Sequence, residues 1–584
     1  MSKFQKTAAV SAAVLALTGT AAALPAAPFL AAITAYAEEA NRVTVDDVEY
    51  TLYEDHAAVY DYLGRNRSEI TIPDTVEGLP VTAVEENAFN GTSLKKVILP
   101  ESVAVIGKGA FASNYSLESV TCPGVKEIGM MAFYVCEVLQ SVTLPEGLTT
   151  IGYSAFNGCK ALTEIKAPST LTEIGAQAFR GTGWLEALHT EGVPVVLNHI
   201  VIDGTKCKGT VTLSTDVTTI GADAFADNAE LTEIKIPGSV TEIRAGAFSG
   251  CTGLKNLALP DSVTEIPDSM CSGCTALEEI TFSDKLTKIG EYAFMKTALR
   301  EIQLPEGVTV IADHTFEECK ALKTFQYWKL EKIGKSAFRD CTSLYFFVNG
   351  EIEEIDNNAF QGCTSLETIL FPLALKKIGN QSFRGCTKLR KVTIMYHLRS
   401  IDNGAFMECT ALEQADIKEP FAELDDQAFS DCPKLVLRGY DGSTTEEYAT
   451  AHNLQFESLG AIQKSDETRG DVTDDGEVSI DDVQTALKAY TERVAGKDPG
   501  LTKRQLWNAD VDYNGKLELE DVQYTLKYYT VNIVALKKTS WNASLSNKET
   551  RQRKSRGSRP GSFFRIQLGS GRMMPPQSTR PSES

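Results

Sequence analysis

The sequence lacks the residue combinations by which most active sites are recognised. Only 6 of its 584 residues are histidine, and they are scattered, with no metal-binding or nucleophile motif around them. A glycine-rich phosphate-binding loop is also missing. Carboxylates are abundant, but they fall at the outward positions of a repeat, which is typical of a solvated surface. These absences predict a protein that is not an enzyme, with a glycan-active enzyme whose paired carboxylates leave little sequence trace as the alternative.

Positive charge is scarce outside the C-terminal end. The chain has 57 Lys and Arg against 78 Asp and Glu, and residues 537–584 hold 11 of these basic residues but only 2 of the acidic ones. Phosphate binding needs a basic surface, so nucleic acid and an anionic membrane surface are excluded as expected partners of the acidic remainder. Residues 537–584 are rich in Ser, Arg and Pro, and we expect them to form a disordered basic tail.

Hydrophobic runs long enough to enter a bilayer are confined to residues 1–37. Lys3 and Lys6 precede a stretch of Ala, Val and Leu that ends in Ala35-Tyr36-Ala37. This pattern is typical of a secretory signal peptide, here cleaved before Glu38, with an uncleaved N-terminal anchor as the alternative. We therefore expect a secreted, extracellular protein that has no membrane span once the signal is removed.

What the chain does contain is a repeat of 22 or 23 residues, marked by an aromatic side chain. Two intervals are twice as long. In one of them Cys271 takes the aromatic position, and a degenerate unit, residues 184–218, fills the other. No single unit of this length can bury its own apolar residues, so the units are expected to stack into a solenoid. The aromatic positions are Phe89, Phe111, Phe133, Phe156, Phe179, Phe225, Phe248, Phe294, Phe316, Phe338, Phe360, Phe383, Phe406 and Phe429.

One clear copy of the repeat reads Leu231-Thr-Glu-Ile234-Lys-Ile236-Pro237, then Val240-Thr-Glu-Ile243, then Ala247-Phe248-Ser-Gly250-Cys251. Residues 79–434, built from such copies, resemble the BspA-like class of bacterial leucine-rich repeats. The resemblance implies an α+β repeat solenoid of short strands with turns or short helices, an N-terminal cap at 38–78 and a C-terminal cap at 435–459. Members of this class are usually surface or secreted proteins that bind other proteins or mediate adhesion.

Most of the cysteines share one position of the repeat, three residues after the aromatic. Other copies place Asn or Thr there, as in Asn114 and Thr297. A position that accepts all three types favours a small buried group that hydrogen-bonds a turn. We therefore expect a column of free thiols, although disulfides between neighbouring repeats are left open. The ten cysteines are Cys136, Cys159, Cys251, Cys274, Cys319, Cys341, Cys363, Cys386, Cys409 and Cys432.

One stretch of the repeats carries aromatic residues at outward or turn positions. Such a cluster can stack on sugar rings or anchor a protein partner, and it is a candidate ligand patch. The alternative interpretation, which the sequence favours, is that some of these side chains fold back into the core. The candidate residues are Trp328, Tyr345, Phe346, Tyr396 and His397.

After a polar linker, residues 460–469, two twelve-residue loops have the spacing of calcium-binding loops. Gly476 and Gly515 stand at position 6, where such a loop turns sharply, and position 7 contributes only a backbone carbonyl. The sequence therefore predicts two bound Ca²⁺ ions. Positions 1, 3, 5, 7, 9 and 12 are Asp471, Thr473, Asp475, Glu477, Ser479 and Asp482 in the first loop, and Asp510, Asp512, Asn514, Lys516, Glu518 and Asp521 in the second.

A helix is predicted after each loop, because apolar residues recur there at helical spacing. The spacing predicts that Val483, Ala486, Leu487 and Tyr490 share one apolar face of the first helix. The residues Val522, Leu526 and Tyr529 repeat this face in the second helix. A shorter helix at residues 502–507 links the two halves. A module of about 65 residues has a marginal core, so bound metal must contribute to its folding.

This duplicated unit, residues 470–536, resembles a type I-like dockerin, a small all-α module with two calcium loops. The resemblance implies that it docks onto a cohesin of a scaffoldin and places the chain in a cellulosome. Thr473 departs from the usual Asn or Asp, which puts the first calcium site in doubt. The alternative is a calcium-stabilised module without a cohesin partner. The positions that correspond to cohesin contacts are Ile480, Asp481, Lys488, Leu519, Glu520 and Lys527.

The sequence as a whole thus predicts a non-catalytic secreted protein. Its repeats would bind an unknown protein or surface ligand, and its dockerin would attach it to a cellulosome. The first alternative is a cellulosomal subunit whose repeats bind plant polysaccharide directly, and a cryptic glycan-active enzyme is the second. The outward residues of a solenoid vary freely over a constant core, so the sequence does not name the ligand.

Overall fold

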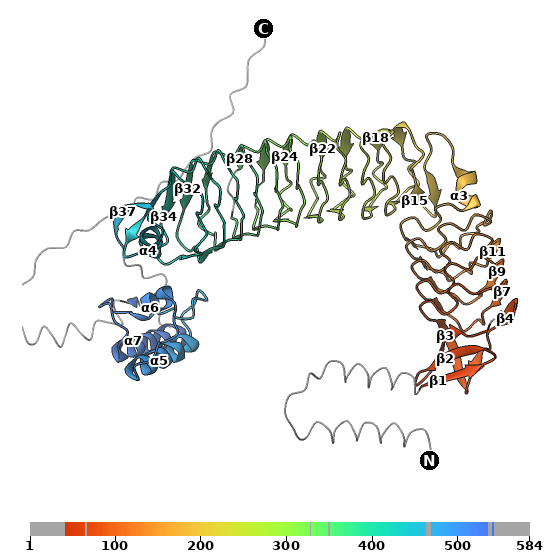
Figure 1. Ribbon diagram of the computed structural model, residues 1–584, viewed down its shortest axis with the longest axis horizontal. Coiled ribbons are helices and arrows are strands. Elements are labelled where there is room, and N and C mark those ends of the chain that lie inside the picture. The colour runs from red at the N-terminus through yellow and green to blue at the C-terminus, as the bar shows by residue number, and fades with distance from the viewer. Residues whose placement is uncertain are drawn as a thin grey trace, which may run out of the picture. The chain divides into compact units, whose positions relative to one another are not determined.

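The computed structural model describes residues 41–64, 67–327, 329–347, 351–462, 469–534 and 540–541. These fall into two compact units, divided between Ala461 and Ile462 (Figure 1). The predicted signal peptide, Trp328, most of the linker and nearly all of the predicted basic tail lie outside the described residues. The first unit is a solenoid of stacked strands and turns, and the second is a small bundle of helices.

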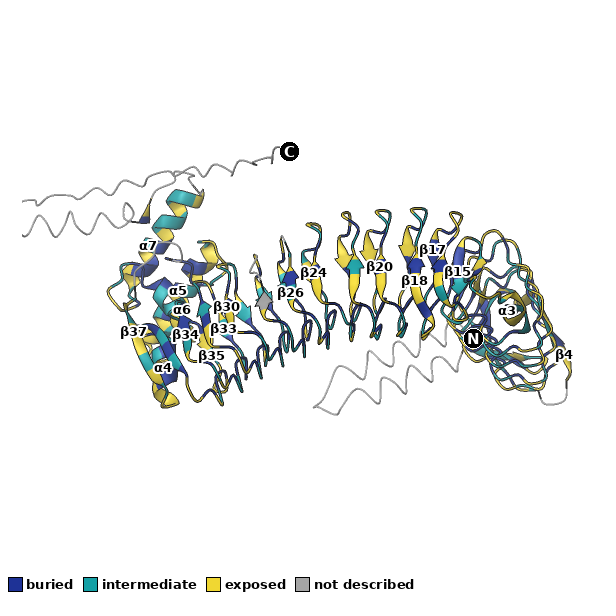
Figure 2. Cartoon of the chain, turned by 90° about the horizontal axis from the view of Figure 1, so that it is seen from above, coloured by how far each residue is buried: buried dark blue, intermediate teal, exposed yellow. Residues whose placement is uncertain are grey.

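Most rungs of the solenoid carry two short strands, which pair in parallel with equivalent strands of neighbouring rungs. In β20, for example, Leu257 is buried while its two neighbours face solvent, so a single apolar residue anchors the strand. Glu233 of one rung pairs with Asn256 of the next, which keeps equivalent side chains in line. Figure 2 shows the result, a buried interior with exposed residues along the outer strands.

One side of the solenoid consists of four sheets, whose repeat strands come from the segment equivalent to residues 231–236. The first holds β4 (Glu69–Thr71), β7 (Lys96–Ile98), β9 (Ser119–Thr121) and β11 (Ser141–Val142). The second holds β16 (Gly209–Thr212), β18 (Leu231–Lys235), β20 (Asn256–Ala258) and β22 (Glu279–Thr281). The third holds β24 (Glu301–Gln303), β26 (Thr324–Gln326) and β28 (Phe346–Phe347). The fourth holds β30 (Thr368–Leu370), β32 (Lys391–Ile394), β34 (Gln414–Ile417), β36 (Val436–Asp441) and β37 (Gln455–Ala461).

The other side consists of four more sheets, whose repeat strands come from the segment equivalent to residues 240–243. The first sheet holds β1 (Arg42–Val45), β2 (Val48–Leu52), β3 (Ala57–Tyr62), β5 (Thr75–Val76), β6 (Leu79–Val84), β8 (Val105–Ile106), β10 (Glu127–Ile128), β12 (Thr150–Ile151) and β13 (Glu173–Ile174). The next two hold β14 (Val195–Leu197), β15 (Ile200–Asp203), β17 (Thr219–Ile220) and β19 (Glu242–Ile243), then β21 (Glu265–Ile266) and β23 (Lys288–Ile289). The last holds β25 (Val310–Ile311), β27 (Lys332–Ile333), β29 (Glu354–Ile355), β31 (Lys377–Ile378), β33 (Ser400–Ile401) and β35 (Glu423–Leu424).

The repeated phenylalanines form a stacked column in the core. Neighbouring rings such as Phe89 and Phe111 lie nearly parallel, with centroids 5.0 Å apart. The backbone follows the same column, because the Phe111 N–H donates to the carbonyl of Ala132 in the next rung at 2.7 Å. Within the described part of the solenoid the only helices are α3 (Gly183–Leu188) and α4 (Thr444–Ala451). The fold is therefore a solenoid of strands and turns, and the short helices expected within its rungs are replaced by turns.

The cysteine column has the role that its spacing predicts. All 13 cysteines are free and buried. Each of the ten in the repeated position donates its thiol to the carbonyl of the aromatic one rung earlier, as Cys136 Sγ does to Phe111 O at 3.0 Å. Asn114 stands in for cysteine there and donates to the carbonyls of Phe89 and Phe111. Burial raises the pKa of the Cys386 thiol to about 12, so it stays protonated and serves as a donor.

The degenerate unit interrupts the stacking more than the sequence indicates. On one side of the solenoid β16 keeps the period of the repeat, since its Thr210 pairs with Glu233 of β18. On the other side the period is shorter, because Ile200 of β15 pairs with Thr219 of β17, only 19 residues later. The buried apolar residues accordingly divide into two clusters, which meet at Ile200 and Val201. An antiparallel hairpin of β14 and β15 follows α3 and begins the second stretch of rungs.

Each end of the solenoid is capped. At the start, β1, β2 and β3 form an antiparallel meander whose last strand pairs in parallel with β6. At the end, α4 connects β36 to β37, which pair in parallel, and Ser443 caps the helix by accepting from the N–H of Glu446. The last rung is therefore covered by a helix and a strand.

The second unit contains α5 (Ile480–Val494), α6 (Lys503–Ala509), α7 (Leu519–Tyr529) and the π-helix η1 (Thr530–Val534). The predicted linking helix is α6, which begins one residue after its N-cap Thr502. Its core is small, and Val472, Ala486 and Ala509 are fully buried at its centre. Trp541, which the sequence assigns to the disordered tail, packs onto this unit and is only 3% exposed.

Candidate functional site

The second calcium loop brings its acidic side chains together. One carboxylate oxygen from each of Asp510, Asp512 and Asp521 lies within 4.8 Å of the other two. The N–H groups of Asn514 and Gly515 donate to the two oxygens of Asp510 at 3.0 and 2.7 Å. Among the described residues this is the only such group of metal-ligand side chains.

The electrostatics of this group fit a divalent cation. Burial raises the pKa of Asp521 to about 6, with a smaller contribution from the neighbouring Asp512 and Asp510. A hard cation with oxygen ligands would neutralise three carboxylates that lie this close together. The side chain of Lys516 at position 7 is exposed, consistent with a position that contributes only its carbonyl. The residues of the second loop therefore fit Ca²⁺.

The first loop has the same frame with one carboxylate fewer. Asp471 accepts from the N–H groups of Asp475 and Gly476 at 3.1 and 3.0 Å. At position 3, Thr473 donates its hydroxyl to Asp482 at 2.9 Å, where the second loop has the acidic Asp512. The exposed side chain of Glu477 faces solvent at position 7. The first loop thus fits the same ion with less negative charge.

The last ligand of each loop also begins the helix that follows it. Asp482 is the third helical residue of α5 and accepts from the N–H of Ser479, the N-cap, while Ser479 accepts from the helix backbone in turn. Asp521 does the same at α7, where the N–H of Glu518 donates to it at 2.7 Å. The orientation of each helix is therefore tied to the carboxylate that would hold the ion.

The apolar face that the spacing predicts for α5 is only partly buried. Val483, Ala486 and Ala489 are buried, but Leu487 is 44% exposed, and its counterpart Leu526 is 43% exposed. The buried face is rotated toward Ala489, because small residues allow α5 and α7 to pack closely. The leucines are left on the outward side of the helices.

These leucines belong to two exposed apolar stripes, which the sequence reasoning missed. Seven-residue spacing puts the members of each stripe on one helix face, and each residue of the first stripe has its mate 39 positions later in the second. Both the spacing and the duplication were visible in the sequence. The two stripes are Ile480, Leu487 and Val494 on α5, and Leu519, Leu526 and Ile533 on α7 and η1.

Charged residues flank the stripes. Asp481 and Glu520 are exposed in the first turns of α5 and α7. Lys488 is exposed one residue after Leu487, and Lys527 is partly exposed one residue after Leu526. The six residues expected to contact a cohesin thus occur on two equivalent helix faces, each an apolar stripe with an acidic and a basic neighbour.

The candidate ligand patch on the solenoid is exposed where it is described. Tyr345 is 53% exposed and Tyr396 also faces solvent, so these two side chains do not fold back into the core. The hydroxyl of Tyr396 lies 3.1 Å from that of Tyr440, a hydrogen bond that raises the pKa of Tyr440 to about 12. His397 is exposed. Trp328 and the side chain of Phe346 lie outside the described part of the chain.

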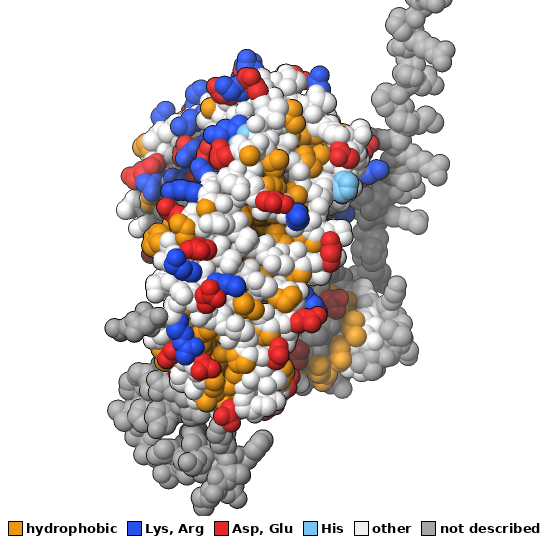
Figure 3. Space-filling model, turned by 90° about the vertical axis from the view of Figure 1, so that its right-hand side faces the viewer, with side chains coloured by type: hydrophobic (Ala, Val, Ile, Leu, Met, Phe, Trp, Pro, Cys, Tyr) orange, Lys and Arg blue, Asp and Glu red, His pale blue; other side chains and the backbone are white. Residues whose placement is uncertain are grey.

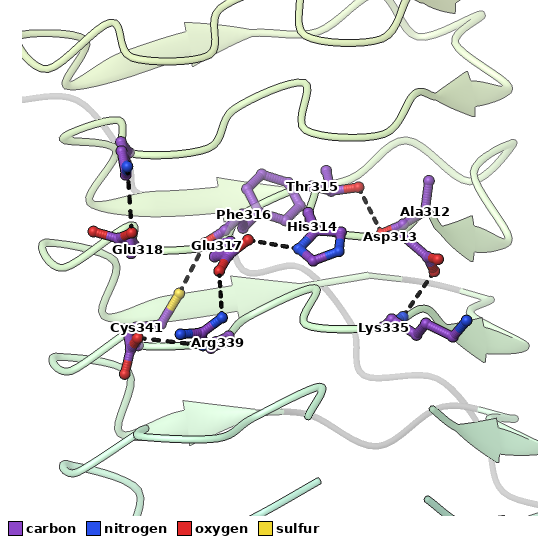
Figure 4. Close-up of polar contacts among 12 residues, drawn as sticks. Ala312, Asp313, His314, Thr315, Phe316, Glu317, Glu318, Lys335, Arg339 and Cys341 are labelled. Carbon is purple, nitrogen blue, oxygen red and sulfur yellow. Dashed lines mark hydrogen bonds and ion pairs between the residues drawn. The ribbon is translucent and has the colours of Figure 1, made fainter. Parts of the chain in front are cut away.

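His314 belongs to a cluster of polar side chains in the solenoid (Figure 4). His314 Nδ1 lies 2.6 Å from the buried Glu317, which also pairs with Arg339 at 3.1 Å. The neighbouring hydroxyl and thiol are engaged, since Thr315 donates to Ala312 O and Cys341 donates to Phe316 O. Burial holds the pKa of Cys341 well above its usual range. The cluster therefore contains no activated nucleophile among its described residues.

A cavity of about 260 Å³ opens where the degenerate unit interrupts the rungs. His189 lines it, with Nε2 3.6 Å from a carboxylate oxygen of Asp203 and Nδ1 3.4 Å from Glu186. Asp223, another lining residue, has its pKa raised by burial. The cavity arises from the broken period of the repeat, so no motif in the sequence marks it.

Elsewhere on the solenoid surface, acidic and basic side chains are interspersed and often form ion pairs. Figure 3 shows acidic and basic side chains among hydrophobic ones on the outward face of the first rungs. Many pair across one rung, such as Lys95 with Glu118 at 3.0 Å and Lys160 with Glu137 at 2.9 Å. These side chains are about half exposed, so each pair contributes little to stability.

Comparison with known proteins identifies the repeats. The family model described as BspA type Leucine rich repeat region matches residues 62–193, 205–323 and 323–436. A leucine-rich repeat protein from Bacteroides ovatus is 25% identical, with 64% of this chain and 94% of that chain covered and a TM-score of 0.33. A leucine rich cell surface protein from Faecalibacterium prausnitzii is 22% identical, with 73% and 95% covered and a TM-score of 0.30. The pneumococcal vaccine antigen PcpA is 14% identical, with 73% and 99% covered and a TM-score of 0.32. A search of the curated proteins finds no match.

Proposed function

Because this chain belongs to the BspA-type leucine-rich repeat family, for which a protein-interaction or surface-binding role is expected, we propose that its solenoid binds a protein ligand and that its second unit is a dockerin. The dockerin would dock onto a scaffoldin cohesin when Ca²⁺ occupies both loops, and would place the protein in a cellulosome. Proteins of this family are typically surface or secreted bacterial proteins. Within the described residues, no helix is both long and apolar enough to cross a bilayer.

The observation that carries the docking proposal is the pair of apolar stripes. A small soluble module rarely leaves large apolar residues such as Leu487 and Leu526 exposed in a row unless they form an interaction face. The stripes lie on helices whose first turns are fixed by Asp482 and Asp521. Calcium would neutralise the loop carboxylates and hold both helices at the angle that the partner recognises. The chain's own residues thus supply the apolar contact, and the ion supplies its rigidity.

The test is capture of the full mature chain by a panel of immobilised cohesins, with calcium and with a chelator. We expect calcium-dependent capture by at least one cohesin, and its loss in the variant Leu487→Asp/Leu526→Asp. The control is Val105→Asp/Val310→Asp, which places the same charges at exposed valines of the solenoid and should leave capture unchanged. Calcium binding without capture by any cohesin would reduce the second unit to a stabilising module.

A second candidate function is direct binding of plant polysaccharide by the solenoid. It is favoured by the exposure of Tyr345 and Tyr396, since exposed aromatic rings stack on sugars. Pull-down on insoluble plant fibre should then retain the chain and release the variant Tyr345→Ala/Tyr396→Ala. Hydrolysis of the fibre by the purified chain would instead support the cryptic glycan-active enzyme.

A further inference from the structure

We propose that the two calcium loops are mechanically coupled, so that Ca²⁺ bound in one loop raises the affinity of the other. This inference rests on the proposed function, because it concerns the same two loops. It is carried by two residues outside the loops, Arg469 and Asn508. Each stands two positions before the first ligand of its own loop, Asp471 or Asp510, and each bonds to the other loop.

Asn508 connects the start of the second loop to the first loop. Its Nδ2 donates to the carbonyl of Asp471, the first calcium position of the first loop, at 2.8 Å. The N–H of Gly470 donates back to the carbonyl of Asn508, also at 2.8 Å. Asn508 is only 1% exposed, so water does not compete for these bonds.

Arg469 makes the reciprocal connection. Its Nε donates to the carbonyl of Val511, the second position of the second loop, at 2.5 Å. Its guanidinium lies 4.4 Å from the ring centre of Tyr513, the fourth position of the same loop. Arg469 is buried as well, and it holds the second loop as Asn508 holds the first.

Trp541 closes this arrangement from the C-terminal side. Its ring stacks on Tyr528 of α7, with centroids 3.9 Å apart, and the Arg469 guanidinium lies 5.6 Å from the Trp541 ring centre. A Cβ at position 470 would lie 2.5 Å from the Trp541 ring, so glycine is required at that contact. The residues that begin the first loop are therefore held between the second loop and Trp541.

Ordering one loop by an ion fixes groups that also belong to the other. A first Ca²⁺ that fixes the second loop immobilises Val511 and Tyr513, and with them Arg469 and the first ligand of the first loop. The second ion then binds a loop that is already ordered, which raises its affinity. By linkage the effect must be the same in both directions.

The test is a calcium titration of the full mature chain, combined with terbium luminescence sensitised by Tyr513 to report on the second loop. We expect a cooperative calcium isotherm. Asp471→Ala should weaken binding at the second loop, and Asp510→Ala should weaken binding at the first loop by the same factor, about 5-fold or more. When Arg469→Ala and Asn508→Ala are already present, adding Asp471→Ala should change the ion affinity of the second loop by less than about 2-fold. A difference of that size is too small to count as coupling. In the control background Lys497→Ala, an exposed lysine of the same unit, the full effect of Asp471→Ala on the second loop should remain.

The outcomes separate this inference from the proposed function. Two calcium sites that fill independently in the unaltered chain would overturn the coupling and leave the dockerin proposal intact. An equal effect of Asp471→Ala in both backgrounds would also overturn it, because the coupling would not pass through Arg469 and Asn508. If the double variant does not fold, the paired Asp471→Ala and Asp510→Ala measurements decide the question alone. Absence of any calcium binding would overturn both proposals.

Discussion

At the scale of single residues, the position three residues after each stacked aromatic contributes a hydrogen bond within the aromatic column. Cys386 donates to Phe360 O at 3.3 Å, and Thr297 places a hydroxyl in the same column, 3.2 Å from Cys319 Sγ. A thiol, a hydroxyl and an amide are thus interchangeable there because each is a small donor to the carbonyls of the aromatic column: Thr297 donates to Phe294 O of its own rung, and Asn114 to both Phe89 O and Phe111 O. The column also explains how the chain can hold 13 cysteines without a disulfide.

We predict that none of the 13 thiols reacts in the folded chain. Burial suppresses the thiolate that reacts with an electrophile, as shown by the pKa of about 12 for Cys386. Ellman's reagent at pH 8 should therefore label no thiol in the native protein and all 13 after denaturation. Fewer than 13 in the denatured chain would reveal disulfides between neighbouring rungs.

The carboxyl of Asp521 predicts how the metal-free second unit responds to pH. Its pKa is raised from 3.8 to about 6, so the folded state holds the proton more tightly than the unfolded state. Stability is then gained as the pH falls through 6 and lost as it rises. Without metal, the free energy of unfolding of this unit should be about 1 kcal/mol higher at pH 5 than at pH 7. Thermal melting in a chelator measures this, and Asp521→Asn should abolish the difference.

At the scale of elements, the stacked aromatic column supports the rungs. Phe338 is fully buried between Phe316 and Phe360, with centroids 5.5 and 5.2 Å away. We expect Phe338→Ala to lower the free energy of unfolding of the solenoid by about 3–5 kcal/mol, because it opens a cavity that the neighbouring rungs cannot fill. Urea denaturation measures the loss. The exposed Tyr345→Ala should change stability by less than about 0.5 kcal/mol.

The regular elements were predictable where one pattern dominates. A period of 22 or 23 residues fixes the strands and the column of Phe248 and its equivalents, because every copy repeats the same contacts. The face of α5 was not predictable in the same way. Apolar residues lie on two of its sides, and only the packing against α7 decides that Ala489 is buried and Leu487 exposed. Arg469 and Asn508 were missed because their bonds join segments about 40 residues apart.

At the scale of the whole molecule, the two units depend on different forces. The solenoid is stabilised by its buried apolar core, and the second unit by a small core and its acidic loops. A chelator should therefore lower the helicity and the melting temperature of the second unit, while the transition of the solenoid stays within about 2 °C, the size expected for an unchanged domain. Calorimetry of the full chain checks both transitions at once. A solenoid transition that fell with the chelator would place a further metal site among its rungs.

The organisation of the whole molecule was more predictable than its ligand. The family, the solenoid and both caps follow from a repeated pattern and its ends. The ligand does not, because outward residues such as Tyr345 and Leu370 carry no contact on which the fold depends. The cavity at His189 was equally invisible, since it exists only where the period fails.

The cross-rung bonds have a consequence for how the protein changes in evolution. In the regular rungs the aromatic residue presents the same carbonyl and the same N–H to the rung after it, as Phe111 does toward Cys136 and Ala132. Duplication of one whole repeat therefore creates no new kind of junction, and deletion of one leaves none unmatched. The length of the outward solenoid surface can grow or shrink in steps of a single gene segment while the two caps, and the module that follows them, are inherited unchanged.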